Sequence, residues 1–306
     1  MMLNNGRVDT RRLRLLLELS RLGSMREVAD EVGVTTSTVS QQIAVLAKEA
    51  GTALVEPDGR RVRLTPAGRR LAAHAVTILA AVDTARLDLE PDGEPAGTVC
   101  VAGFASAIRR GVVPVIAELK ASHPKVRIRI HEHEPPEALA LLGSDEVDLV
   151  LTYDYNLAPA YFDRTVETIP LWSVPWSLGT PPSGVDGGSA LDAFCRYQDS
   201  DWIVNSRHSA DGDVVRTVAS MAGFEPRITH RVDGLELVQD LIAAGLGVGL
   251  LPADRATVPG VRLHPLSAPD VRLRAYAAVR RGHAAWPALA LVLNRLRTVP
   301  PAAAEP

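Results

Sequence analysis

The chain has 306 residues, of which 46% are hydrophobic and 23% charged, and its formal net charge is −3. This length exceeds one typical domain of roughly 100 to 200 residues, and the composition is that of a globular protein. No apolar run approaches the ~20 residues that a membrane helix needs, and the arginine-rich start lacks the apolar core of a signal peptide. We therefore expect a cytoplasmic protein without a membrane partner. Its two cysteines, Cys100 and Cys195, are interpreted as buried thiols of a reducing compartment.

Charge is divided unevenly along the chain. Residues 1–70 carry 12 basic and 8 acidic side chains, a net +4, whereas the remainder carries 21 basic and 28 acidic ones, a net −7. A basic head on an acidic body favours contact between the head and a polyanion such as DNA.

Three short helices are predicted in the basic head. The first begins after the N-cap Asp9 and ends at Gly23. The second begins after Ser24, which forms a capping box with Glu27, and ends at Gly33. The apolar residues spaced to face the core are Leu13, Leu16 and Leu17 in the first helix and Val28, Ala29 and Val32 in the second.

The third helix is expected to begin after the N-cap Thr35. One face is a buried stripe of Val39, Ile43, Leu46, Ala47 and Ala50. The opposite face is small and polar and has no acid: Thr36, Ser37, Ser40, Gln41, Ala44 and Lys48. Two helices joined by a glycine-containing turn, the second with such a face, are typical of a recognition helix in the DNA major groove. An ordinary solvated helix face has the same composition and is the alternative.

A charged hairpin is predicted directly after these helices. Leu54 and Val55 begin an extended run, Asp58-Gly59 is a turn signal, and an arginine-rich strand returns to Leu64. Its position favours DNA contact over a merely solvated surface. We interpret residues 1–66 as a winged helix-turn-helix domain. Its candidate DNA contacts are Thr35, Thr36, Ser37, Ser40, Gln41, Arg60, Arg61 and Arg63.

A long helix over residues 66–90 is predicted next, with Thr65 as N-cap and Pro66 in its first turn. Its apolar residues alternate spacings of four and three, as in a coiled-coil seam: Leu71, Ala75, Ile78, Val82, Ala85 and Leu89. Because a lone helix has little to bury such a seam against, we expect it to pair with a second copy of the chain. Packing on its own domain is the alternative. A homodimer would present two recognition helices to two half-sites on double-stranded DNA.

The segment from Leu13 to Ala73 resembles the DNA-binding region of LysR-type transcriptional regulators. The resemblance rests on the motifs Gly23-Ser24-Met25, Val32-Gly33-Val34-Thr35, Val39-Ser40-Gln41-Gln42-Ile43 and the run from Gly59 to Gly68. Two stretches depart from the family pattern. Val55-Glu56-Pro57 stands where Phe-Glu-Arg is typical, and Thr35-Thr36-Ser37 replaces Ser-Gln-Pro, which changes the expected base preference. The resemblance implies a homotetramer, built as a dimer of dimers, whose DNA bending responds to a small-molecule effector.

Residues 91–97 are dense in proline, glycine and acids and are interpreted as a hinge. Strands and helices alternate beyond it, which predicts a parallel, doubly wound α/β sheet. Strands are expected near 98–103, 126–130, 147–153, 165–169, 172–178, 202–205, 228–232, 247–251 and 271–279. Helices are expected near 106–121, 137–142, 209–223, 234–244 and 284–297.

This body resembles the two-lobed effector domain of the same family, which is similar to type 2 periplasmic binding proteins. The clearest match runs from Asp233 to Val238 and from Ala243 to Pro252. We assign residues 98–163 with 267–300 to the first lobe and residues 164–266 to the second.

A ligand is expected between the lobes, at the carboxyl ends of the strands, where helix N-termini point. The candidate effector contacts are Ser106, Tyr153, Asp154, Asn205, Arg207, His208 and Gly247. For each of them alone, helix capping or surface exposure is the alternative. Their arginine, histidine and hydroxyl content favours a small anion.

Other chemical signals are set aside. His131 to Glu134 alternates histidine and glutamate, so a strand leaves only two ligands on one face, and we expect no metal and no cofactor. No nucleophile motif is found, and we expect a regulator and not an enzyme. Two alternatives stay open: an architectural DNA-binding protein without effector, and an enzyme or solute-binding module joined to a DNA-binding head.

Overall fold

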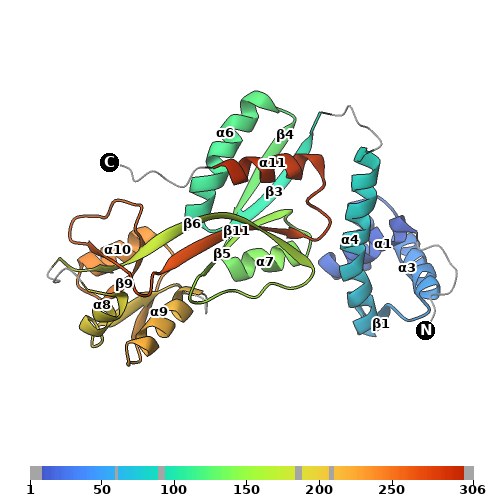
Figure 1. Cartoon of the computed structure of the whole chain (residues 1–306). Coiled ribbons are helices and arrows are strands. Elements are labelled where there is room, and N and C mark those ends of the chain that lie inside the picture. The colour runs from blue at the N-terminus through green and yellow to red at the C-terminus, as the bar shows by residue number, and fades with distance from the viewer. Residues whose placement is uncertain (1–8, 59–60, 89–93, 183–187, 207–209, 300–306) are drawn as a thin grey trace.

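The structure, a computed structural model, describes residues 9–58, 61–88, 94–182, 188–206 and 210–299. A helical head, a long helix and a two-lobed α/β body follow one another along the chain, and the first lobe lies between the head and the second lobe (Figure 1). Within these residues no helix has both the length and the apolarity needed to cross a bilayer.

The head contains α1 (Thr10–Leu22), α2 (Met25–Val32), α3 (Thr36–Ala50) and an antiparallel hairpin of β1 (Val55–Asp58) and β2 (Arg61–Leu64). The expected caps are present: Asp9, Ser24 and Thr35 each accept a backbone N–H at the start of a helix. The predicted leucines of α1, with Val28, Ala29, Val39, Ile43 and Leu46, form the core. The prediction that Val32 is buried is wrong. Val32 is 38% exposed because it is the last residue of α2, and the last turn of this helix extends beyond the core.

Helix α4 (Pro66–Asp88) leads from the head to the body and begins with the Gly68 N–H donating to Thr65 Oγ1 at 3.0 Å. Its first half packs on the head, where Ala72, Ala75, Val76 and Leu79 are buried. The alternative of packing on its own domain therefore holds for Ala75. Of the predicted seam, Leu71 and Val82 are half-buried and Ile78 is 42% exposed. The Ala85 side chain and Leu89 lie outside the described part.

The body is built on a mixed nine-stranded sheet whose path is β4, β3, β5, β11, β6, β9, β7 and β8, with β10 also paired to β6. The strands are β3 (Gly97–Gly103), β4 (Val126–Glu132), β5 (Leu149–Tyr155), β6 (Val166–Thr180), β7 (Asp201–Val204), β8 (Arg227–Arg231), β9 (Val248–Pro252), β10 (Arg262–Pro265) and β11 (Arg272–Arg280). The two-lobed α/β architecture is confirmed. The expected parallel pairing holds for β3 with β4 and β5, and for β7 with β8 and β9.

The two lobes are joined by antiparallel strands. The expected strands 165–169 and 172–178 are one continuous strand, β6, whose residues 166–175 pair with β11 and whose residues 176–180 pair with β9 and β10. The lobe boundary expected at residue 164 thus precedes a strand that belongs to both lobes. The chain crosses to the second lobe on β6 and returns to the first on β11. These two strands pair antiparallel, so the sheet is mixed and not parallel throughout as expected.

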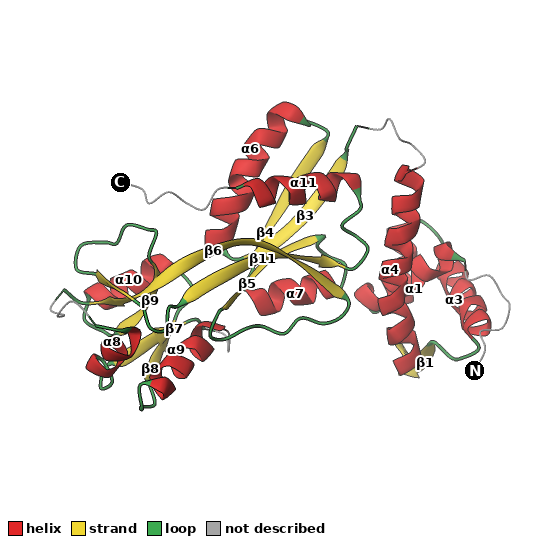
Figure 2. Cartoon of the chain, viewed as in Figure 1, coloured by secondary structure: helices red, strands yellow, loops and turns green. Residues whose placement is uncertain are grey.

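Helices cover both faces of the sheet (Figure 2). In the first lobe α6 (Val113–Ser122) and α11 (Pro287–Thr298) pack on one face and α7 (Pro135–Gly143) on the other. The expected helix 106–121 is a short α5 (Ala105–Ala107), a π-helical stretch η1 (Ile108–Val112) and α6. The second lobe carries α8 (Ala190–Arg196), α9 (Ala210–Met221) and α10 (Leu235–Ala243). Neither α8 nor β10 was expected, because both are short.

Candidate functional site

The polar face of α3 is exposed. Thr35, Thr36, Ser37, Ser40 and Gln41 all lie on the surface. On the opposite stripe Val39, Ile43 and Leu46 are buried in the head, whereas Ala47 and Ala50 are half-buried. The Thr35 hydroxyl lies 2.8 Å from the hydroxyls of both Ser37 and Thr38, which orders the first turn of the helix. The geometry therefore leaves this face available to a groove of DNA.

The hairpin that follows α3 carries the predicted arginines of the wing. Arg63 forms an exposed ion pair with its cross-strand neighbour Glu56, with Nε and Oε1 3.0 Å apart. Because a solvent-exposed ion pair contributes little free energy of stabilisation, Arg63 can leave Glu56 and bind a phosphate instead. Arg61 opens β2, but its side chain, like the whole of Arg60, lies outside the described part.

A cavity of about 60 Å³ lies between the two lobes and is called the main cavity. Its apolar wall includes Phe104, Tyr153, Trp176, Ile203, Val215, Leu235, Leu250 and Leu273. Its polar lining consists of Ser106, Glu134, Asn205, Asp211 and Asp233. The structure thus brings three of the predicted effector residues together there: Ser106, Tyr153 and Asn205. They follow or end β3, β5 and β7, at the carboxyl ends of parallel strands, where α/β folds bind ligands.

Hydrogen bonds join the lobes across this cavity. The Asn205 amide in the second lobe donates to Glu134 Oε2 in the first at 3.0 Å. The hydroxyls of Tyr153 and Tyr155 on β5 donate to the two oxygens of Asp211, in the first turn of α9; the bond from Tyr155 measures 2.7 Å. Complete burial, and then the charge of Asp211, raise the pKa of Tyr155 well above its usual range, so its hydroxyl stays a donor.

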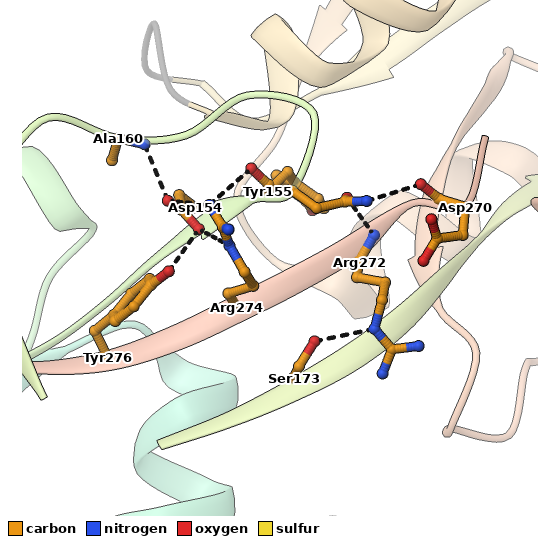
Figure 3. Close-up of polar contacts among 9 residues, drawn as sticks. Asp154, Tyr155, Ala160, Ser173, Asp270, Arg272, Arg274 and Tyr276 are labelled. Carbon is orange, nitrogen blue, oxygen red and sulfur yellow. Dashed lines mark hydrogen bonds and ion pairs between the residues drawn. The ribbon is translucent and has the colours of Figure 1, made fainter. Parts of the chain in front are cut away.

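Asp154 does not line the main cavity. It is 3% exposed and lies on the other face of β5, because side chains alternate along a strand. Arg274 on β11 donates two hydrogen bonds of 2.8 Å to its carboxylate (Figure 3). The Ala160 N–H at 3.1 Å and the Tyr276 hydroxyl at 3.2 Å complete the set. These contacts commit Asp154 to holding the first lobe together.

Gly247 also lies away from the main cavity. It precedes β9 at the amino ends of the strands, with φ +155°, and a Cβ atom there would lie 2.5 Å from the Asp201 carbonyl oxygen. Glycine is therefore needed to pass the start of β7. The other two candidates, Arg207 and His208, lie outside the described residues.

Sequence reasoning missed Arg255, a half-buried residue just after β9. It lines two further cavities beside the main one, of about 30 and 80 Å³. The same rule that pointed to Asn205 after β7 points to the residues after Pro252, because β7 and β9 are parallel. The glycine-rich run before β9 drew attention to the wrong end of that strand.

Both parts of the chain match models of known families. Residues 10–69 match the bacterial regulatory helix-turn-helix protein of the lysR family, and residues 92–300 match the LysR substrate binding domain. The chain belongs to the LysR family. It is therefore a DNA-binding transcriptional regulator with an effector-binding domain, as the resemblance of its motifs implied.

Relatives of this LysR-family chain are themselves transcriptional regulators. The transcriptional dual regulator GltC of Bacillus subtilis is 26% identical over 256 residues, which cover 80% of this chain and 81% of GltC. OxyR of Escherichia coli, a DNA-binding transcriptional dual regulator, is 27% identical over 263 residues, covering 80% and 79%. The structure of full-length OxyR from Pseudomonas aeruginosa superposes with a TM-score of 0.71 at 20% identity, over 96% of this chain and 99% of that one. This likeness extends the shared fold over head, linking helix and body.

Proposed function

We propose that this regulator binds DNA as a dimer, or as a dimer of dimers, and that a small molecule in the main cavity changes how it binds or bends that DNA. The observation that carries this proposal is the position of the main cavity between the lobes. Its polar lining residues Asn205 and Glu134 hydrogen-bond across it. A ligand that competes with or adds to such bonds has a different affinity for open and closed lobes, which is what an effector requires.

Thr35, Thr36, Ser37, Ser40 and Gln41 are the proposed contacts of α3 with bases and phosphates. Their exposure supports this assignment. Arg60, Arg61 and Arg63 are the proposed contacts of the wing, where guanidinium groups bind phosphates or a narrow minor groove. Ile78 supports pairing through α4, since this large apolar side chain is 42% exposed although Ala72, Ala75, Val76 and Leu79 of the same helix are buried.

The effector is proposed to be a small anion. The size of the main cavity, about 60 Å³, supports a molecule of few atoms, since a water needs about 10–15 Å³ of such space. Its charged lining within the described residues consists of the carboxylates of Glu134, Asp211 and Asp233. An anion therefore requires a cation beyond this lining to balance it.

Some relatives are named hydrogen peroxide-inducible genes activators. We infer that this chain does not respond to peroxide through its thiols. The expectation of two buried thiols is wrong: Cys100 on β3 is half-buried and Cys195 on α8 is exposed, and neither lines the main cavity. Burial raises the pKa of the Cys100 thiol, which lowers its reactive thiolate fraction. Peroxide is expected to leave the DNA complex of the wild type and of the C100S/C195S variant equally unchanged; a response only in the wild type would refute the inference.

The decisive experiment on function is a nuclease-protection footprint on the DNA directly upstream of the protein's own gene. Two or more protected half-sites, spaced by whole helical turns of about 34–36 Å, are expected from a dimer of winged heads. Uniform or absent protection at low salt would contradict sequence-specific binding there. Repeating the footprint with candidate effectors, preselected by thermal stabilisation, tests the effector part of the proposal.

A further inference from the structure

A smaller cavity of about 30 Å³ adjoins the main cavity and is called the side chamber. The two share the wall residues Phe104, Ser106, Trp176, Leu235 and Leu273. The side chamber adds Ala107, Arg110, Trp172, Val174, Pro252, Asp254 and Arg255. Its charged residues are thus two arginines and one aspartate, whereas the described charges of the main cavity are all acidic. The two spaces therefore differ in the sign of charge.

Arg110 and Arg255 differ in the hydrogen-bond and ion-pair partners of their guanidinium groups. Arg110 is paired with Asp254, both side chains being largely buried at 11% and 15% exposure, and its guanidinium lies 6.0 Å from the Trp172 ring. Arg255 is half-buried, and within the described residues its guanidinium makes neither a hydrogen bond nor an ion pair. A backbone hydrogen bond and then Arg109 lower the pKa of Glu236, and the charge of Arg255 adds a smaller effect. A partly desolvated guanidinium without a bonded partner favours an anion.

Ser106 brings a second unused donor to the side chamber, from the opposite lobe. It lies in the short α5 that follows β3, is half-buried, and lines both spaces. In the described part of the chain its hydroxyl makes no hydrogen bond. A polar group in such a place costs free energy unless a partner is supplied, and here water or a ligand is the partner available.

We propose that the side chamber binds the carboxylate of an effector through the Arg255 guanidinium and the Ser106 hydroxyl, while the apolar remainder of that effector fills the main cavity. The space of about 30 Å³ suits a group of two or three heavy atoms. The shared wall of Phe104, Trp176, Leu235 and Leu273 suits an alkyl chain or an aromatic ring. The chemical class is therefore a small apolar monocarboxylic acid.

This inference rests on the proposed effector function. Arg255 supplies the cation that a bound anion needs and that the described lining of the main cavity lacks. Arg255 belongs to the second lobe and Ser106 to the first, so a carboxylate between them ties the lobes together. The ion pair between the effector's carboxylate and Arg255 then both determines which molecules bind and favours the closed arrangement of the lobes. The corresponding amide has no negative charge and cannot form this ion pair.

The test measures binding of acetate, isovalerate and phenylacetate, each against its amide, to the full-length protein by calorimetry and thermal shift. We expect isovalerate or phenylacetate to bind the wild type, and their amides to bind at least about ten-fold more weakly. Arg255→Gln and Ser106→Ala are expected to weaken acid binding, the former at least about ten-fold. Arg216→Gln is the matched control, since Arg216 is an exposed arginine of α9 outside both spaces, and acid binding should not change.

Three results would overturn the proposal: no acid binds at concentrations up to about 10 mM, amide and acid bind equally, or Arg255→Gln binds the acid as tightly as the wild type does. Ser106→Ala keeps the test informative if Arg255→Gln fails to fold. The footprint separates this inference from the proposed function. If an acid binds through Arg255 but does not change the footprint, the proposed effector control is refuted and the carboxylate subsite is retained. If another molecule changes the footprint of the wild type and of Arg255→Gln alike, the effector control is retained and the carboxylate subsite is refuted.

Discussion

Asp154 and Tyr155 are neighbours in sequence, yet the alternation of β5 sends their side chains to opposite faces of the sheet. Tyr155 reaches Asp211 of the second lobe, whereas Asp154 stays within the first lobe with Arg274 and Tyr276. A carboxylate that is almost fully buried is stable only with such partners. The identity of a residue therefore indicates little about its role until the face is known.

Asp154→Asn is expected to lower the free energy of unfolding of the body by about 2–3 kcal/mol, because Arg274 loses its two-bond partner while a buried amide replaces the charge. Urea unfolding measures this change. Asp163→Asn, in the exposed loop before β6, is the control and should change stability little. Effector binding should survive Asp154→Asn; its loss without a loss of stability would contradict the structural role.

Gln41 and Arg61 are expected to differ in how their loss affects DNA binding. Gln41→Ala should weaken binding to some operator sequences by about 1–3 kcal/mol and binding to others hardly at all, because the glutamine amide hydrogen-bonds to the edges of particular bases. Arg61→Ala should weaken all sequences alike and reduce the salt dependence of binding, because a phosphate contact carries no sequence information. Affinities for an operator and its single-base variants at several salt concentrations test both; a uniform loss for Gln41→Ala would refute base reading.

At the scale of elements, α4 has a side buried against the head and a side exposed at the surface. Its buried side chains, such as Ala75 and Leu79, attach it to α1, while Ile78 lies on the surface. The exposed side is then the part of α4 that can pair with a second copy.

Ile78→Asp is expected to convert the dimer to monomer, because a charge in an apolar helix interface is left without a partner. Light scattering with size exclusion gives the mass at several protein concentrations. His74→Asp, an exposed position one turn earlier on α4, is the matched control and should stay dimeric. Should Ile78→Asp remain dimeric while still folded, the pairing surface lies elsewhere.

At the scale of the whole molecule, the lobes communicate through two kinds of link. The strands β6 and β11 carry the chain between them, and the hydrophobic core continues across this crossing. The hydrogen bonds from Tyr153, Tyr155 and Asn205 close the space beside it. Covalent crossing strands with breakable polar contacts are what a hinged domain needs, since only the contacts have to change.

Asp211→Asn is expected to loosen the lobes. The carboxylate accepts from two tyrosines, and an amide offers one acceptor oxygen to them. Small-angle scattering of the ligand-free body should then give a larger radius of gyration than the wild type. Asp213→Asn is the control, because Asp213 is exposed on the same helix and forms its ion pair with Arg216 of that helix. Equal radii for Asp211→Asn and wild type would mean that the lobes are held by the strands alone.

Local features of this protein follow from its sequence because they depend on neighbours in the chain. Caps such as Asp9, Ser24 and Thr35, the left-handed Gly23 and Gly33, and the spacing of the buried leucines predicted the head nearly residue by residue. The same motifs identified the family. In the body, most strands and helices were predicted for the same reason.

Position in space was decided by the tertiary structure, because it depends on contacts between distant segments. The strand crossing on β6 and the packing of Ala75 on α1 required such contacts. So did the positions of the candidate effector residues: Asp154 lies on the face of β5 away from the main cavity, Gly247 precedes β9 at the end away from it, and Arg255 lines the side chamber. The sequence predicts which residues alternate along a strand and where that strand ends. Which face of the strand, and which of its ends, lies against the other lobe depends on how the sheet folds.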